Sequence, residues 1–191
     1  AAGAVDGKRR EVAAKIGSAL EGPGAFAHGA EGVGLFRSEM LYMDREQAPE
    51  EQEQFEAYQK VLLAAGEEPV IFRTMDVGGD KPLPYLHIPR EENPFLGYRA
   101  VRIYAEFADL FRTQLRAILR AGAFGNALLM IPMVHSLDQI LWVKQELARV
   151  RSELQAQGLR YATTLPLGIM VEVPSVCYII DHFCEEVDFF S

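Results

Sequence analysis

Two stretches decide the fold: GVGLFRSE at residues 32–39 and VIFRTMDVGGDK at residues 70–81. Each begins with a short apolar run typical of a buried parallel strand, and each then turns polar at an arginine, Arg37 or Arg73. The carboxyl ends of parallel strands lie along one edge of a sheet, which is where barrel folds carry their functional groups. The two stretches therefore predict neighbouring strands that bring two guanidinium groups together.

Similar apolar runs alternate along the chain with longer stretches of helical period. This alternation is typical of βα units and a parallel sheet. Six strands are expected, at about residues 12–16, 32–36, 69–75, 128–134, 167–173 and 187–191.

The best marked helix follows Ser136. In the string SLDQ, Ser136 and Gln139 have the spacing of a capping box, and Gly158 offers a stop. One apolar stripe runs between them and should face the sheet; it consists of Ile140, Val143, Leu147, Val150 and Leu154.

Two further helices are expected. One starts near Pro49, a good first-turn residue, and buries Phe55, Tyr58 and Leu62. The other covers about residues 94–121 and is either one helix or two helices broken near Ala105.

The fold class expected from this pattern is α/β, as an incomplete (β/α)8 TIM-type barrel. No linker or strong repeat divides the chain, so a single domain over residues 1–191 is expected. A doubly wound sheet is disfavoured because no GxGxxG turn follows the first strand. A complete barrel takes roughly 250 residues, and about six of its eight units fit this length. Because the sequence stops in the apolar string DFFS, we expect a fragment that lacks the closing strands.

Composition excludes several classes of function. Lys and Arg number 19 against 27 Asp and Glu, a net charge of −8, which disfavours a nucleic-acid-binding surface. No apolar run approaches the roughly 20 residues of a membrane span. Cys177 and Cys184 fit neither a disulfide framework nor a metal site, and a reducing cytoplasm is expected. Both cysteines are interpreted as small buried hydrophobes of one amphipathic helix, and neither His135 nor His182 is given a catalytic role.

Arg37 and Arg73 are the first candidate ligand-binding residues. Two guanidinium groups at adjacent strand ends can fork onto one phosphate or carboxylate. The alternative is that each arginine pairs structurally with Glu39, Asp76 or Asp80.

The segment after the third strand adds further candidates. The pair Gly78 and Gly79 would let the backbone approach a ligand, and Lys81 follows it. Arg99 and Arg102 open the next helical stretch, and Arg99 is favoured as the one that faces the ligand.

Glu172 is the one charged residue of the apolar string LGIMVEVP. A carboxylate in such a strand is costly unless it is compensated. Mg²⁺ is one candidate, since it takes one or two carboxylates plus substrate oxygens. An ion pair with Arg37 or Arg73 is the other.

Taken together, these strings resemble the phosphoenolpyruvate-binding barrel of Enzyme I of the sugar phosphotransferase system. The resemblance covers nearly the whole chain, through GVGLFRSEMLYMDRE, FRTMDVGGDKPLPY, REENPFLGYRAVRI, LRAILRAGAFG, MIPMVHS, GIMVEVP and VDFFS. It implies that Arg37 and Arg73 hold the phosphate of phosphoenolpyruvate and that Glu172 is a Mg²⁺ ligand. Lys81 and Arg99 are included in the expected substrate site, and no catalytic residue is expected within the chain.

The resemblance also implies a larger enzyme. In the family, a histidine on a preceding domain accepts the phosphoryl group and passes it to HPr, and a cysteine on a later strand protonates the enolate. A homodimer is expected for the full-length protein. The alternatives are a barrel of the pyruvate phosphate dikinase or phosphoenolpyruvate synthase type, or a non-catalytic regulatory or dimerisation module.

Overall fold

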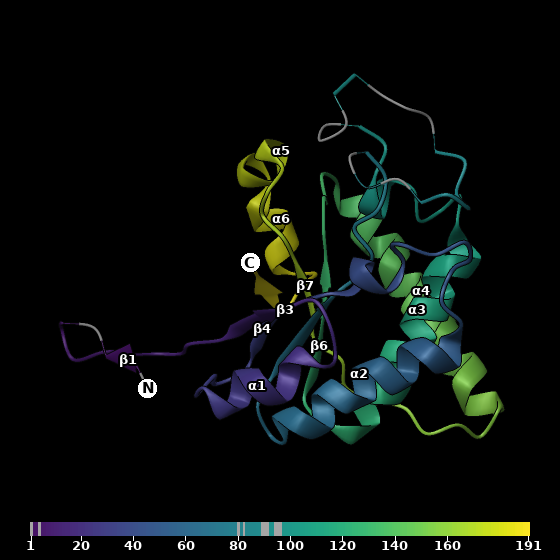
Figure 1. Cartoon of the computed structure of the whole chain (residues 1–191). Helices are drawn as coiled ribbons and strands as arrows, with labels where there is room; N and C mark the ends of the chain where they lie inside the picture. Colours follow the sequence, from purple (N-terminus) through teal and green to yellow (C-terminus); the bar gives the residue numbers. More distant parts are fainter. Residues whose placement is uncertain (1, 4, 80, 82, 89–91, 94–96) are drawn as a thin grey trace.

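The computed structural model describes residues 2–3, 5–79, 81, 83–88, 92–93 and 97–191, and its main feature is a six-stranded parallel sheet (Figure 1). The strands pair in chain order: β3 (Ala14–Ile16), β4 (Val33–Arg37), β5 (Val70–Arg73), β6 (Ala127–Ile131), β7 (Leu167–Ile169) and β8 (Phe189–Phe190). The predicted α/β class is confirmed. The sheet is open, with β3 and β8 at its edges, so the closed barrel stays a prediction.

Five of the six strands are shorter than the sequence predicts, and only β4 has the predicted length. The third predicted strand ends at Arg73 instead of Met75, because the backbone N–H of Met75 donates to Oε1 of Gln114, on a helix, at 2.9 Å. The fourth and fifth predicted strands likewise end early, at Ile131 and Ile169. The polar ends of these strands therefore belong to the loops above the sheet.

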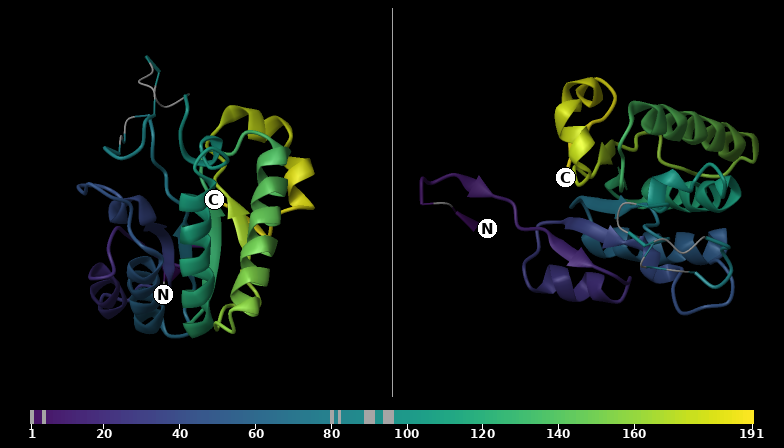
Figure 2. Two further views of the ribbon diagram at one scale, coloured as in Figure 1. Left: turned by 90° about the vertical axis from the view of Figure 1, so that its right-hand side faces the viewer. Right: turned by 90° about the horizontal axis from the view of Figure 1, so that it is seen from above.

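Four helices pack in the same order as the strands. They are α1 (Glu21–Ala27), α2 (Glu51–Ala65), α3 (Ala108–Ala121) and α4 (Leu137–Ala156), and each contacts the next. Figure 2 shows α2, α3 and α4 side by side along one face of the sheet. Because all six strands are parallel, the loops that follow them lie at the same edge of the sheet.

The prediction for α4 is confirmed. The backbone N–H of Ser136 donates to Oε1 of Gln139 at 3.3 Å, and Gly158 adopts φ 68° just after the helix. Its predicted stripe is buried throughout, at Ile140, Val143, Leu147, Val150 and Leu154. In α2, Tyr58 and Leu62 are buried as expected, whereas Phe55 is only partly buried.

The helix expected over residues 94–121 is wrong in its first part. Only α3 is α-helical; a short 3-10 turn, η2 (Ala100–Arg102), precedes it, and residues 94–96 lie outside the described part of the chain. Ala100 has φ 50°, which an α-helix excludes. The predicted break near Ala105 is confirmed, since residues 103–107 form turns.

An aromatic cluster lies directly beneath the strand ends. Phe36 of β4, Phe72 of β5 and Tyr58 of α2 are fully buried, with ring centroids 5.1–5.7 Å apart. Such rings bury a large apolar area and pack in tilted or edge arrangements. Because Phe36 and Phe72 each precede an arginine, this cluster fixes where Arg37 and Arg73 leave the sheet.

Two further segments differ from the sequence expectation. A hairpin of β1 (Ala2–Gly3) and β2 (Arg9–Arg10) extends away from the sheet (Figure 1). The helix expected around the cysteines is two short ones, α5 (Pro174–Tyr178) and α6 (Ile180–Cys184). Both cysteines are exposed, so their interpretation as buried hydrophobes is wrong. Among the described residues, no helix is long and apolar enough to cross a membrane.

Gly168 offers a test of the β7–β8 pairing. A Cβ at this position would lie 2.5 Å from Cδ2 and Cζ of Phe189. Overpacking of this kind costs about 1–3 kcal/mol, so Gly168→Ala should lower the free energy of unfolding in urea by that amount. The matched control is Gly24→Ala in α1, where a Cβ meets nothing within 4 Å and should be neutral or stabilising. Equal stabilities of the two variants would contradict the observed packing.

Candidate functional site

Arg37 and Arg73 lie opposite one another in the parallel register of β4 and β5. The side chain of Arg37 passes Gly17, where a Cβ would lie 3.2 Å from its Nη2. Its Nε is buried without a hydrogen-bond partner among the described residues. The predicted pairing of the two strands is therefore confirmed, and it places the two arginines at neighbouring strand ends.

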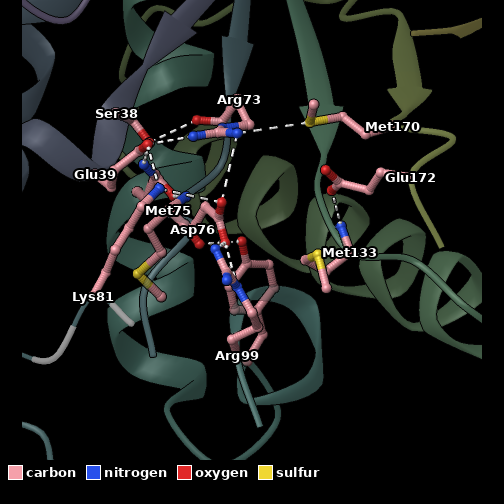
Figure 3. Close-up of polar contacts among 12 residues, drawn as sticks. Ser38, Glu39, Arg73, Met75, Asp76, Lys81, Arg99, Met133, Met170 and Glu172 are labelled. Carbon is pink, nitrogen blue, oxygen red and sulfur yellow. Dashed lines mark hydrogen bonds and ion pairs between the residues drawn. The ribbon is translucent and has the colours of Figure 1, made fainter. Parts of the chain in front are cut away.

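Arg73 is held by two buried carboxylates (Figure 3). Its Nη2 is paired with Oε1 of Glu39, and its Nη1 lies 3.5 Å from Oδ2 of Asp76. The structural pairing considered from the sequence is therefore present for Arg73, with Glu39 and Asp76 as partners. Asp80, the third partner considered, lies outside the described residues. The Nε of Arg73 is buried and has no partner within the described chain.

Asp76 connects three cations (Figure 3). Oδ1 of Asp76 accepts from Nε and Nη2 of Arg99, at 3.1 and 2.9 Å. Its Oδ2 lies 3.4 Å from Nζ of Lys81, which also reaches Glu39 at 3.1 Å. Three of the four predicted substrate-binding cations thus meet at one carboxylate.

Gly78 permits a close approach within the chain, whereas its expected approach to a ligand stays a prediction. Its φ is +99°, and a Cβ would lie 2.7 Å from the carbonyl oxygen of Tyr98. Its backbone exchanges two 3.0 Å hydrogen bonds with Lys81 and forms a bridge with Arg99. The absence of a side chain at Gly78 therefore allows the segment with Tyr98 and Arg99 to pack closely against it. Gly78 forms bridges with both Lys81 and Arg99.

A buried polar network supports this site from below, and the sequence reasoning did not identify it. Gln114 of α3 accepts from the N–H of Met75 and donates from Nε2 to Oγ of Ser38 at 2.9 Å. The Ser38 hydroxyl in turn donates to the carbonyl of Arg73 at 2.6 Å. A signal existed: Gln114 occupies an otherwise apolar stripe of α3 beside Phe111, so a buried partner could have been expected.

Tyr104 completes the network. It lies within 2.7 Å of Oγ1 of Thr74, and its hydroxyl donates to the carbonyl of Met75 at 2.6 Å. Burial raises the pKa of Tyr104 well above its usual value, so the hydroxyl keeps the proton that it donates. The turn from Arg73 to Asp76 is therefore fixed by hydrogen bonds to both α3 and the segment before it.

A pocket of about 380 Å³ lies beside the cation cluster. Its charged lining is balanced, with two arginines and two carboxylates: Arg99, Arg102, Asp76 and Glu172. Arg99 and Glu172 are thus brought together as predicted, whereas Arg37 and Arg73 are not among the lining residues. The volume is in the range of sites for small molecules.

Glu172 is exposed, so the expectation of a buried carboxylate that needs compensation is wrong. Its Oε1 accepts from the backbone N–H of Met133 at 2.7 Å (Figure 3). It forms no ion pair with either Arg37 or Arg73 within the described part of the chain. The carboxylate is therefore oriented by the backbone and remains accessible to a ligand.

Two non-glycine residues with positive φ flank the pocket, Ala100 at 50° and Met133 at 57°. Ala100 directly follows Arg99, and the backbone N–H of Met133 donates to Glu172. Such conformations cost of order 1–3 kcal/mol and cluster at functional sites. His135 precedes the N-cap residue of α4, and burial together with the charge of Arg102 lowers the pKa of its imidazole.

The residues fit a magnesium ion only in part. Within the described ranges there is no group of three or more His, Cys, Asp or Glu that could hold a metal ion. Asp76 is occupied by cations, which leaves Glu172 as the accessible carboxylate of the pocket. One protein carboxylate is compatible with Mg²⁺ when substrate oxygens supply further ligands.

Gln114→Met tests the supporting network. The change removes partners from Met75, Ser38 and Tyr58 in a fully buried position, and unsatisfied buried groups cost about 1–3 kcal/mol. We expect a loss of that size in the free energy of unfolding, measured by urea denaturation. Gln155→Met, on the exposed face of α4, is the control and should stay within about 0.5 kcal/mol of wild type. An unchanged stability of Gln114→Met would argue against the network.

Comparison with known proteins identifies the family of the chain. Residues 1–191 match the family described as PEP-utilising enzyme, PEP-binding domain. The chain is 78% identical over 186 residues to multiphosphoryl transfer protein 1 of Escherichia coli K12, and 50% identical to a phosphoenolpyruvate-protein phosphotransferase of Geobacillus stearothermophilus.

Both alignments cover 97% of this chain, but only 22% of the Escherichia coli protein and 32% of the Geobacillus protein. The chain thus spans less than a third of the length of these relatives. The resemblance drawn from the motifs is confirmed at the level of the family. By its match over the entire sequence, this chain belongs to the PEP-binding domain family of the PEP-utilising enzymes.

Proposed function

We propose that this chain is the phosphoenolpyruvate-binding domain of a longer phosphoenolpyruvate-protein phosphotransferase. Arg37, Arg73, Lys81 and Arg99 would bind the phosphate and carboxylate of the substrate. The observation that carries the proposal is the convergence of cations from β4, β5 and the following loops at one edge of the sheet, beside a pocket. Guanidinium groups match phosphate and carboxylate oxygens in pairs, and phosphoenolpyruvate has both groups.

Buried donors without partners support an anionic ligand. Nε of Arg37 and Nε of Arg73 are both buried and lack a partner among the described residues. A buried donor left unsatisfied costs about 1–3 kcal/mol. An anion bound at the strand ends would supply the missing acceptors, which would convert this cost into binding free energy.

The charge balance of the pocket supports the proposal of a magnesium ion at Glu172. The two arginines and two carboxylates of the lining cancel, whereas phosphoenolpyruvate carries up to three negative charges. When bound, Mg²⁺ would supply positive charge to the phosphoryl group. Glu172 would hold it with one carboxylate, and the backbone N–H of Met133 fixes the orientation of that carboxylate.

The chain's own residues would bind and orient the substrate. In the proposed reaction, the full-length protein moves the phosphoryl group to a histidine of another domain and then to HPr. We assign no catalytic residue to the present chain. The chain is proposed to be a single domain, a (β/α)8 barrel that further strands would close. A homodimer in the cytoplasm belongs to the same proposal and comes from the sequence resemblance.

Two alternatives were open from the sequence. Transfer to a nucleotide, as in a dikinase or synthase, is less well supported, because the relatives named above are a multiphosphoryl transfer protein and a protein phosphotransferase. A non-catalytic module is less well supported because all five predicted site residues lie at one edge of the sheet. They are Arg37, Arg73, Lys81, Arg99 and Glu172.

Glu172→Gln tests the metal in the full-length protein. Wild type should transfer the phosphoryl group of phosphoenolpyruvate to protein in a Mg²⁺-dependent reaction. The variant should need at least about tenfold more Mg²⁺ for half-maximal transfer, since it loses the proposed ligand charge. The measurement is a titration of Mg²⁺ against label transferred from phosphoenolpyruvate.

Glu185→Gln is the matched control, because Glu185 is exposed, follows α6 and does not line the pocket. It should leave the Mg²⁺ titration unchanged. Identical titrations of wild type and Glu172→Gln would exclude Glu172 as the ligand. For the isolated chain, calorimetry should detect weak or no binding of phosphoenolpyruvate, and tight binding would overturn the proposal that further strands complete the site.

A further inference from the structure

We propose that Asp76 is a positioning residue, which sets the geometry of Arg73 and Arg99 for the phosphoenolpyruvate of the proposed function, on which this inference rests. Asp76 follows β5, is 4% exposed and lines the pocket. No other carboxylate in the described chain contacts three cations, whereas Glu39 contacts Arg73 and Lys81 only. Asp76 is therefore the residue through which the three cation-bearing segments are connected.

The geometry divides its two oxygens between different partners. Oδ1 accepts from Nε and Nη2 of Arg99, while Oδ2 faces Nη1 of Arg73 at 3.5 Å and Nζ of Lys81 at 3.4 Å. Nε and Nη2 lie along one side of the Arg99 guanidinium, and both donate to Oδ1. These two hydrogen bonds fix the position and the plane of the guanidinium. A displacement of Asp76 would therefore move two predicted substrate contacts together.

The backbone around Asp76 is held as firmly as its side chain. Before it, the N–H and carbonyl of Met75 are bound to Gln114 and Tyr104, both fully buried. After it, the carbonyl of Val77 accepts from the N–H of Ala100 at 2.9 Å. These hydrogen bonds fix the position of Asp76. The positions of the cations that pair with it are therefore set by the carboxylate.

A carboxylate at this place is otherwise unfavourable for the proposed function. It lines a pocket for an anion, and like charges repel strongly where water is excluded. If Asp76 were only a nearby charge, its removal would strengthen anion binding. If it positions Arg73 and Arg99, its removal should weaken binding. The two interpretations predict changes of opposite sign.

Asp76→Asn separates them in the full-length protein. Asparagine has the same shape but only one acceptor oxygen, so it cannot serve Arg99 on one side and both Arg73 and Lys81 on the other. We expect the Kd for phosphoglycolate, an analogue that has the phosphate and carboxylate but no transferable enol phosphate, to rise at least about tenfold. The measurement is calorimetry in the presence of Mg²⁺, with the melting temperature of each variant recorded beside it.

Asp109→Asn is the matched control. Asp109 also pairs with an arginine, Arg112, at 3.0 Å, but it is exposed and does not line the pocket. It removes the same charge and one Asp–Arg ion pair, and it should change the Kd by less than about twofold, since exposed pairs contribute little. A similar loss in both variants would overturn the inference.

Asp76→Glu covers the case in which Asp76→Asn does not fold. It keeps the charge and moves the carboxylate by one methylene, for which the adjoining pocket has room. Positioning predicts weaker binding at unchanged net charge, whereas a purely electrostatic role predicts no change. If neither variant folds, Asp76 is a structural residue and the inference is wrong.

The outcomes also separate this inference from the proposed function. Wild-type protein that does not bind phosphoglycolate contradicts the proposed function itself. Wild-type binding together with equal or tighter binding by Asp76→Asn contradicts only the role of Asp76.

Discussion

The parallel register of β4 and β5 is the constraint on which the site depends. It places Arg37 directly opposite Arg73, and two guanidinium groups at adjacent strand ends repel each other. The chain compensates with Glu39 and Asp76, both nearly buried and both paired with Arg73. A buried charge requires such opposite charges close by, because its desolvation is costly when it is unpaired. These carboxylates also pair with Lys81 and Arg99, and so they determine where the segments after β5 lie.

The support for this arrangement comes from outside the charged cluster. Gln114 of α3 and Tyr104 hold the backbone between Arg73 and Asp76, and the aromatic rings beneath it fix the strand ends. Gly78, with φ +99°, lets the segment with Arg99 lie against the segment with Lys81. The β5 side of the site is therefore held by hydrogen bonds to several other segments. On the opposite side of the pocket, Glu172 is exposed and is oriented through the N–H of Met133.

Much of the fold could be predicted from local pattern. All six strands of the sheet and the helix after Ser136 were expected, because apolar periodicity and a capping box are encoded within a few residues. The segment before α3 and the pair of helices with Cys177 and Cys184 were not. There the backbone follows long-range contacts, such as the hydrogen bond from Ala100 to Val77, which no local pattern reveals.

The sequence by itself determined the site residue types and the edge of the sheet to which they belong, because residues after a parallel strand must lie at its carboxyl end. It also determined the family, through motifs that extend over nearly the whole chain. Only the tertiary structure decided the pairing within the site. Whether Arg73 faces a ligand or a carboxylate, and whether Glu172 is buried or open, depends on distances between segments far apart in sequence. Side-chain charge is a local property, whereas its partner and its burial are set by packing.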